Sequence, residues 1–205
     1  MDQQVTDGRI RRGDQTRRVV LSKAVDVASV DGLDGLSIGR LAGELDISKS
    51  GLIAHFGTKE ELQLATIRAA RAIFVTTVVA PALETPPGSK RLRLLLEGWL
   101  AYSSDRRFPG GCFFARASHE YAARPGPIRD ALAVIDEEWV RLIAETVAEA
   151  QEAGEIDPTV DPAQLAFDLS AFLDAANLRS LLGDDSVYDR AYRSMRDRIA
   201  AVSLS

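Results

Sequence analysis

The sequence has one cysteine, Cys112, and two histidines among its 205 residues. A single cysteine cannot form a disulfide within the chain, and Cys112 with His55 and His119 does not make a ligand set at the spacing of a metal site. The N-terminus is polar, unlike a secretory signal, and the apolar runs are too short and interrupted to span a bilayer. We therefore expect a reduced, cytoplasmic protein without a metal, a cofactor or a membrane partner.

Basic charge is scarce as well, since the formal net charge is -5 at pH 7. Sequence-independent binding to nucleic acid depends on many phosphate contacts, so this acidity argues against an architectural or non-specific DNA-binding protein. The positive charge is concentrated, because the stretch from Arg9 to Lys23 holds six basic residues against one acid, Asp14. Any affinity for nucleic acid must therefore come from a local patch.

Apolar residues recur at three- and four-residue spacings along most of the chain, the pattern of amphipathic helices. Ser37, Ser48 and Thr58 stand where helix N-caps are needed, and a glutamate three residues after Thr58 completes a capping box. Asp161 followed by Pro162 is a further helix start. No strand pattern or internal repeat competes, so the sequence predicts an all-α fold of about nine helices.

These helices divide into segments of unequal size. Residues 1–13 are polar and lack apolar periodicity, which predicts a flexible basic arm. Residues 14–60 form a three-helix unit, and residues 61–205 form a larger helical domain. The helices are expected at about 14–31, 38–45, 48–54, 58–80, 92–103, 128–154, 162–182 and 186–202. Pro81 is expected to end the fourth of them.

Residues 37–62 have the layout of a helix-turn-helix that reads the major groove of duplex DNA. The short helix after Ser48 begins with small and cationic side chains, where the backbone amides and the helix dipole favour a phosphate and where bulk would block a groove about 12 Å wide. Leu52 and Phe56 would face inward. A plain helical hairpin is the alternative, but it does not explain the whole set beside a basic stretch. The expected DNA contacts are Arg17, Arg18, Ser37, Ser48, Lys49, Ser50, Gly51, Ile53, His55 and Lys59.

Residues 16–62 resemble the N-terminal DNA-binding domain of the TetR family of bacterial transcriptional regulators. The resemblance rests on Ser37, Leu41-Ala42, Ile47-Ser48-Lys49, Gly51, His55-Phe56 and Lys59-Glu60-Glu61-Leu62. Two positions depart from the family pattern. Ile53 stands where the family usually has a tyrosine that touches a phosphate, so it would contact a thymine methyl group or a sugar instead. Asp46 stands at a turn position often held by glycine, which aspartate tolerates because it adopts left-handed backbone angles.

The resemblance implies an effector-responsive repressor that binds a palindromic operator as a homodimer and is released by a small molecule. The fourth helix would couple the two sites, since it begins at the DNA-binding domain and ends against the pocket. In the family the last two helices usually form the dimer contact, here expected at Leu165, Leu169, Phe172, Leu173, Ala176, Tyr192, Met195 and Ile199. The middle helices enclose the effector pocket, for which the candidates are Trp99, Tyr102, Cys112, Phe113, His119, Phe167 and Asn177.

Other functions have weaker support in the sequence. His119 next to Glu120 could serve acid–base chemistry, and Cys112 could sense redox state, although a lone cysteine beside two phenylalanines is more often buried and inert. A helical enzyme or small-molecule carrier without specific DNA binding is the alternative. No nucleophile with a base, no paired carboxylates and no glycine-rich phosphate loop is evident, so we assign no catalytic residue.

Overall fold

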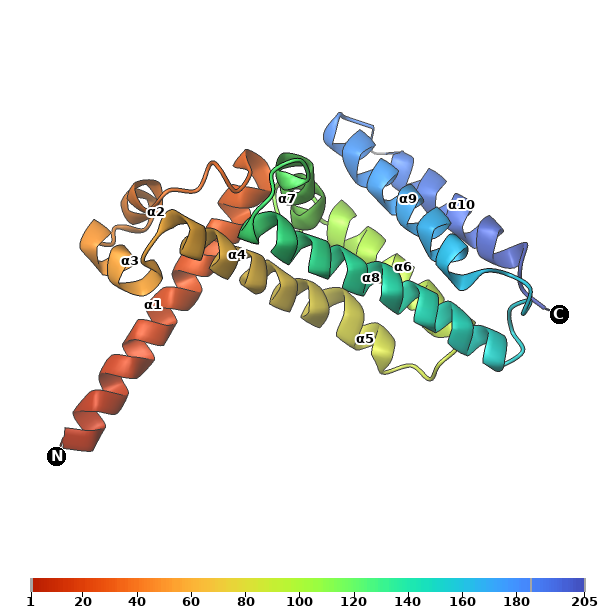
Figure 1. Cartoon of the computed structure of the whole chain (residues 1–205), viewed down its shortest axis with the longest axis horizontal. Coiled ribbons are helices and arrows are strands. Elements are labelled where there is room, and N and C mark those ends of the chain that lie inside the picture. The colour runs from red at the N-terminus through yellow and green to blue at the C-terminus, as the bar shows by residue number, and fades with distance from the viewer. Residues whose placement is uncertain (1, 185, 205) are drawn as a thin grey trace.

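The computed structural model describes the backbone of residues 2–184 and 186–204, and the side chains of residues 13–184 and 186–204. Within these residues the fold is helical throughout, apart from one isolated bridge between Ile156 and Ser203 (Figure 1). The elements are α1 (Asp2–Asp31), α2 (Ile38–Leu45), α3 (Lys49–Phe56), α4 (Lys59–Phe74), η1 (Val75–Val79), α5 (Ala80–Leu83), α6 (Ser89–Ser104), α7 (Phe113–Tyr121), α8 (Pro127–Glu152), α9 (Pro162–Leu181) and α10 (Val187–Ala200). Because α4, η1 and α5 follow one another without a break, they count as one helix, and the described residues then form nine helices. The prediction of an all-α fold of about nine helices is therefore confirmed.

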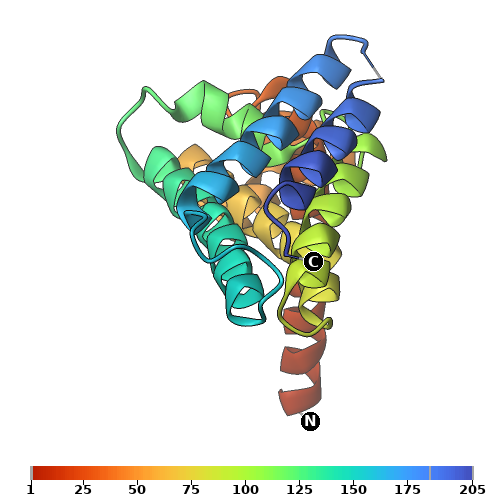
Figure 2. The same cartoon turned by 90° about the vertical axis from the view of Figure 1, so that its right-hand side faces the viewer.

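The helices form a small head and a longer body. In Figure 1, α2 and α3 lie beside α1 at one end, and the N-terminal part of α1 extends away from the rest of the molecule. From this head α4 runs into the body and packs along α8. Figure 2 shows α9 and α10 as neighbours on one side of the body, with α8 next to α9. The helix-turn-helix layout predicted for the head is therefore present.

The predicted caps hold the helix starts in place. The hydroxyls of Ser37, Ser48 and Thr58 each accept a hydrogen bond from a backbone N–H three residues later. The Glu61 side chain accepts one from the backbone N–H of Thr58, which completes the capping box. Asp161 accepts from the N–H groups two and three residues later. These bonds satisfy amides that have no partner inside the helix.

The turn between α2 and α3 has the expected left-handed residue. Asp46 has φ 54° and ψ 41°, and its backbone N–H donates to the carbonyl of Ala42. Aspartate adopts this conformation more readily than most residues because its short polar side chain can bond locally. The aspartate therefore fills a turn position that favours glycine.

Two helix boundaries differ from prediction. Residues 2–12 continue α1 as a helix where the sequence predicted a flexible arm. Apart from Gly8 this stretch consists of residues that a helix accommodates, and a helix can form without the apolar periodicity whose absence predicted an arm. The fourth helix also continues beyond Ala80. There a π turn bonds the amide of Ala80 to the carbonyl of Val75, five residues back, directly before Pro81. This wider turn accommodates a ring that would clash with a carbonyl of a regular α-helix.

The continuous helix of residues 59–83 is long and apolar enough to cross a membrane, contrary to the expectation that no such segment exists. Half of its most apolar window is buried inside the protein. Ile67, Ala70, Phe74 and Val78 point into the core. Length and composition are weak evidence for a membrane segment, because the central helix of a helical bundle meets the same criteria.

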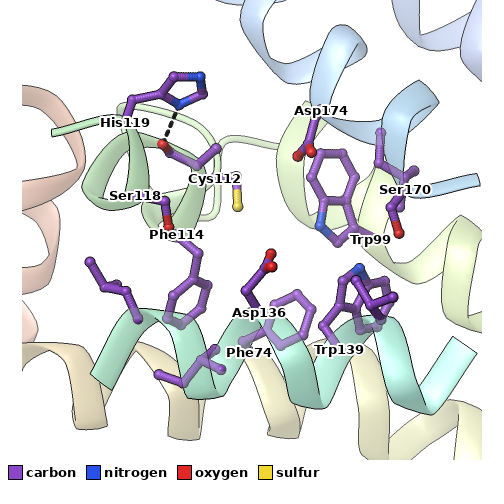
Figure 3. Close-up of a pocket in the computed structure, with 15 residues that line it drawn as sticks. Phe74, Trp99, Cys112, Phe114, Ser118, His119, Asp136, Trp139, Ser170 and Asp174 are labelled. Atoms are coloured by element: carbon purple, nitrogen blue, oxygen red, sulfur yellow. Dashed lines mark hydrogen bonds between the residues drawn. The ribbon is translucent and has the colours of Figure 1, made fainter. Parts of the chain in front are cut away.

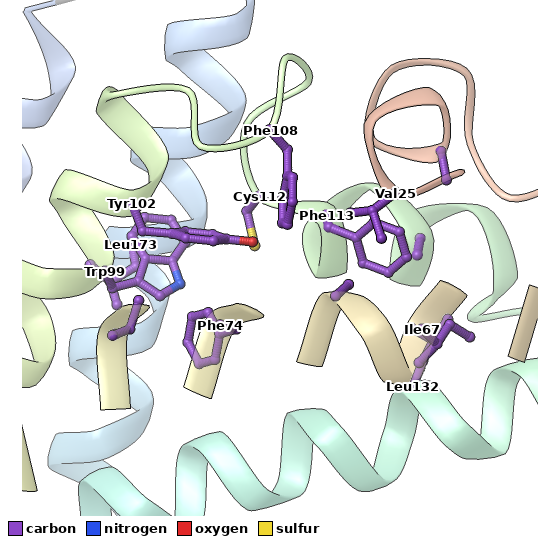
Figure 4. Packing of buried hydrophobic residues seen from close by; sticks show 14 of the residues in the cluster. Val25, Ile67, Phe74, Trp99, Tyr102, Phe108, Cys112, Phe113, Leu132 and Leu173 are labelled. Atoms are coloured by element: carbon purple, nitrogen blue, oxygen red, sulfur yellow. The ribbon is translucent and has the colours of Figure 1, made fainter. Parts of the chain in front are cut away.

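One apolar core runs through both the head and the body. It contains Val25 and Ala28 of α1 as well as Met195 and Ile199 of α10. Aromatic rings fill its middle part, as Figure 4 shows for the side chains labelled around Phe74. The Phe74 ring lies edge-on to neighbouring aromatic rings, with centroid distances of 5.3 to 5.9 Å. Such pairs add to the burial energy of the rings themselves.

Candidate functional site

The N-terminal end of α3 is an exposed, small and cationic surface. Ser48, Lys49 and Ser50 are all exposed, and Ile53, one turn further along, keeps 46% of its surface. Leu52 and Phe56 of the same helix are buried. The predicted inward and outward faces of the helix are therefore confirmed, and the exposed face is free of bulky aromatic side chains.

Gly51 has a structural role in this helix start. A Cβ at this position would lie 3.0 Å from the hydroxyl oxygen of Ser48, the atom that accepts the bond from the Gly51 N–H. A larger residue would press against the N-cap itself. The glycine predicted as a DNA contact therefore also leaves room for the N-cap hydroxyl.

Arg17 makes contacts within the protein. Its guanidinium donates to the backbone carbonyl of His55 and lies over the Phe56 ring, 4.6 Å from the centroid. The side chain is half-buried, whereas Arg18 is exposed. Arg17 therefore fastens α1 to the end of α3. The sequence offered no sign of this contact, because 38 residues separate Arg17 from His55.

Lys59 and Ser37 are likewise held by neighbours. The Lys59 ammonium donates to the carbonyl of Asp34 at 2.7 Å, and its side chain remains about half exposed. The Ser37 hydroxyl is occupied by the cap of α2. Both groups are at the surface of the head, so contact with a phosphate stays a prediction for each.

A cluster of polar side chains, which we call the junction cluster, joins the head to the body. Glu120 of α7 accepts hydrogen bonds from the backbone amides of Leu33 at 2.7 Å and Asp34 at 2.9 Å. Tyr121 donates to the Asp34 carboxylate at 2.7 Å. Gln63 of α4 donates to the Leu33 carbonyl at 2.8 Å and to the Tyr121 hydroxyl at 3.0 Å. The loop between α1 and α2 is thus bound by two elements of the body.

Asp34 is the centre of this cluster. Hydrogen bonds from Arg124 and then from Tyr121 hold the pKa of its carboxyl below the ordinary value, because both bonds favour the charged form. Burial, and then the hydrogen bond to this carboxylate, raise the pKa of Tyr121 to about 12. Tyr121 therefore stays protonated and remains a donor at neutral pH.

A cavity lies in the body between α4, α7, α8 and α9. Its empty volume is about 740 Å³, including the space at its open mouth. Figure 3 shows aromatic rings around this space and carboxylates that point toward it. The lining residues are Phe74, Trp99, Cys112, Phe114, Ala115, Ser118, His119, Leu132, Ile135, Asp136, Trp139, Val140, Ser170, Leu173 and Asp174.

Three of the seven predicted pocket residues, Trp99, Cys112 and His119, line this cavity. Tyr102 and Phe113 are buried in the adjacent core and do not line it. Asn177 is also buried, and its side-chain oxygen accepts from the Cys112 amide at 2.8 Å and from the Ser103 hydroxyl at 3.1 Å. It therefore holds the loop that precedes α7.

Phe167 was also predicted in the pocket and lies outside it. It is on the outer face of α9, with 65% of its surface exposed. Sequence reasoning in turn missed Phe74, Phe114 and Trp139 as lining residues. All three fit an amphipathic stripe equally well as core positions, so periodicity alone could not single them out.

The electrostatics of the cavity are set by acids. Burial raises the pKa of Asp174, the nearby Asp136 raises it further, and His119 opposes the shift. Burial also raises the pKa of the Cys112 thiol to about 11. No described lining residue is lysine or arginine. Among the described side chains, no group of three or more His, Cys, Asp or Glu is arranged to hold a metal ion.

The predicted dimer contact requires a correction. Most of its residues are buried inside the single chain, because the apolar stripes of α9 and α10 face α8, α6 and one another. The buried members are Leu165, Leu169, Leu173, Ala176, Met195 and Ile199. Phe172 is half-buried, and Tyr192 is exposed. A second stripe faces outward on α9 and the residue that follows it, where Phe167, Leu178 and Leu182 are 65%, 52% and 79% exposed.

Solved structures share this fold over nearly the whole chain. A TetR transcriptional regulator from Chloroflexus aurantiacus J-10-FL is 25% identical, with a TM-score of 0.84 over 95% of this chain and 100% of that one. A transcriptional regulator from Saccharomonospora viridis in complex with choline is 24% identical, with a TM-score of 0.80 over 94% and 100%. AibR in complex with isovaleryl coenzyme A and operator DNA is 20% identical, with a TM-score of 0.71 over 91% and 97%.

Family models match both parts of the chain. Residues 20–66 match the bacterial regulatory proteins of the tetR family, and residues 88–195 match the tetracyclin repressor-like C-terminal domain. No curated protein sequence is significantly similar to the chain. The second match alone covers more than half of the sequence, and the first covers the helix-turn-helix. The chain therefore belongs to the TetR family of bacterial transcriptional regulators.

Proposed function

We propose that this DNA-binding regulator is a repressor that binds a palindromic operator as a homodimer and is released by a small-molecule effector. The exposed N-terminal end of α3 would enter the major groove, with Lys49 and Ser50 foremost. Ile53 would lie against a thymine methyl group or a sugar, since its side chain cannot donate a hydrogen bond.

One observation carries the proposal of effector control: α7 takes part in two sites. Ser118 and His119 of this helix line the cavity, and the next two residues, Glu120 and Tyr121, bind the loop between α1 and α2. Phe74 gives α4 a second link, since it lines the cavity on the helix that begins at Lys59. An effector that prefers one arrangement of α7 and α4 would therefore change the affinity for DNA by thermodynamic linkage.

Complexes of proteins with the same fold support a small-molecule effector. The Saccharomonospora viridis protein is bound to choline, and AibR to isovaleryl coenzyme A and operator DNA. The two ligands differ widely in size and charge. The fold therefore accommodates ligands of several kinds, and the residues that line each cavity decide which ligand it takes.

Dimerisation would use the outward stripe of α9. Phe167, Leu178 and Leu182 are large apolar side chains that are exposed. Tyr192 on α10, the helix that follows α9, is exposed as well. Exposed apolar patches of this kind are typical of protein contacts. A twofold dimer could place two α3 helices about 34 Å apart, which matches successive turns of the major groove.

The test is a titration of the purified protein on the DNA upstream of its own gene, against random DNA of equal length. We expect tight binding to the former alone, and a loss of about tenfold or more for Lys49→Ala. Lys90→Ala, an exposed lysine at the start of α6, is the matched control and should bind as the wild type does. Unchanged specific affinity of the Lys49 variant would remove α3 from the groove, and equal affinity for random DNA would contradict operator recognition.

A further inference from the structure

We propose that the cavity between α7, α8 and α9 takes an organic cation, a quaternary or protonated amine with apolar substituents. The inference deepens the proposed function, because it assumes that this cavity is the effector site. Three features of the cavity carry it: the aromatic wall, two carboxylates without partners and a lining free of lysine and arginine.

The wall of the cavity is rich in aromatic rings. Phe74, Trp99, Phe114 and Trp139 all line it, and Figure 3 shows their rings around the enclosed space. The Phe74 ring holds two of the others edge-on, at 5.9 Å from Phe114 and 5.3 Å from Trp139. Aromatic faces attract cations through the ring quadrupole, and tryptophan does so most strongly. An apolar ammonium ion fits such a wall better than a hydrophilic metal ion would.

Two carboxylates face this wall from different helices. Asp136 projects from α8 and Asp174 from α9, and Figure 3 shows both carboxylates pointing toward the space between the rings. Neither makes a hydrogen bond or an ion pair with any other described residue. Elsewhere on the protein surface acids such as Glu138 and Glu149 are paired with arginines. The two cavity acids therefore have no charged partner among the described residues, and both lie beside the aromatic wall.

No described side chain of the cavity supplies a fixed positive charge. Among the described lining residues His119 alone is of a type that can become cationic, and its Nδ1 is engaged with the carbonyl of Ala115 at 2.6 Å. Burial and the neighbouring Asp136 raise the pKa of Asp174, which shows that a second negative charge is unfavourable there. A bound anion would increase this repulsion, a neutral molecule would leave it unchanged, and a cation would relieve it.

A further polar atom is available inside the cavity. The hydroxyl oxygen of Ser170 is buried and has no hydrogen-bond partner in the protein. It lies on α9, one turn before Asp174, and lines the same space. A buried hydroxyl without a partner is costly, so a donor or acceptor on the ligand would restore its hydrogen bonding.

The chain carries its own reporter of binding. It has two tryptophans in total, and both line the cavity. We would measure affinity by calorimetry and locate the site by the change in tryptophan fluorescence. The probes are phenyltrimethylammonium, its uncharged isostere tert-butylbenzene and the anion 4-tert-butylbenzoate. We expect the cation to bind at least about tenfold more tightly than either of the others.

Charge-neutral variants then assign the effect to the carboxylates. Asp136→Asn and Asp174→Asn should each weaken the cation by about tenfold and leave tert-butylbenzene within about twofold of the wild type. The matched control is Glu137→Gln, an exposed acid next to Asp136 that does not line the cavity. It should leave all affinities unchanged. Equal or tighter binding of the neutral or anionic probe, or no effect of the two asparagine variants, would overturn the proposal.

The same protein separates this proposal from the proposed function. If phenyltrimethylammonium binds but the affinity for the upstream DNA is unaltered, the cation site stands and effector control is refuted. If specific DNA binding responds to the anion or the neutral isostere instead, effector control stands and the cation site is refuted. Circular dichroism and thermal unfolding of each variant show whether a change in affinity reflects a change in folding.

Discussion

Replacement of Glu120 by alanine should destabilise the whole protein, although the residue lies on a short helix and is only half-buried. Its carboxylate accepts hydrogen bonds from the amides of Leu33 and Asp34, at 2.7 and 2.9 Å. The loop that carries these amides turns through Gly32, whose φ is 79°. Neither amide has a backbone hydrogen-bond partner within a helix. Loss of the carboxylate would therefore leave the N–H of Leu33, a fully buried residue, without an acceptor.

The magnitude follows from the two bonds. A hydrogen bond to a charged group contributes about 1.5–3 kcal/mol when buried, and the exposed bond to Asp34 contributes less because water can replace it. We therefore expect Glu120→Ala to cost about 2–4 kcal/mol of unfolding free energy. For a chain of this length that lowers Tm by roughly 5–15 °C. Glu120→Gln should cost about half as much, since its amide oxygen can accept only one of the two bonds while its NH₂ faces the other donor.

Differential scanning calorimetry and urea unfolding at one fixed protein concentration would measure both variants, because association changes apparent stability. Glu97→Ala is the control, since this exposed glutamate of α6 has no ion pair or hydrogen bond with another described residue. If Glu120→Ala unfolds with the same midpoint as Glu97→Ala, the junction cluster does not stabilise the protein. Communication between the cavity and the head through α7 would then have no physical basis either.

Three further predictions test local features. Gly110→Ala should lower Tm by several degrees, because the added methyl group would overlap the backbone near the end of α1. Gly39→Ala is the control: no atom lies near its added methyl group, so Tm should rise slightly. Arg124 holds the pKa of Asp34 below its ordinary value, so the carboxylate stabilises the fold above about pH 4 and this stabilisation is lost as the pH falls; Asp34→Asn should flatten the acid side of a plot of Tm against pH, and an unchanged slope would refute this. Burial raises the pKa of Cys112 to about 11. At pH 8 a disulfide reagent should therefore label the folded protein roughly a hundredfold more slowly than the urea-unfolded protein. Equal labelling rates would contradict this and would favour a role of Cys112 in redox sensing.

Features that depend on local bonding could be predicted from the sequence. Ser37, Ser48 and Thr58 cap their helices because each cap needs only its own side chain and an amide three residues later. The left-handed turn at Asp46 follows from the same short range of interaction. These four residues, together with the inward-facing Leu52 of α3, were enough to locate the helix-turn-helix in the sequence.

Features that depend on which helix faces which could not be predicted. The apolar stripe of Leu165 and Leu169 was expected at a dimer contact, but α9 uses it against its own core and presents Phe167 on the other side. Periodicity identifies an apolar face without identifying its partner. For the same reason Trp139 was not recognised as a pocket residue, and the hydrogen bond from Arg17 to the carbonyl of His55 was not foreseen.

The continuity of the core across the head and the body limits how this protein could be recombined with its relatives. The two family matches end at residue 66 and begin at residue 88, which suggests two exchangeable modules. Yet Val25 and Ala28 of α1 share one core with α7, and Leu33 and Asp34 are held by Glu120 and Tyr121. A chimera that grafts a foreign head onto this body would therefore need to import the matching end of α7 along with that head. Within this protein, a change at the end of α7 that reshapes the cavity lining at Ser118 or His119 therefore also acts on the contacts that hold the loop after α1.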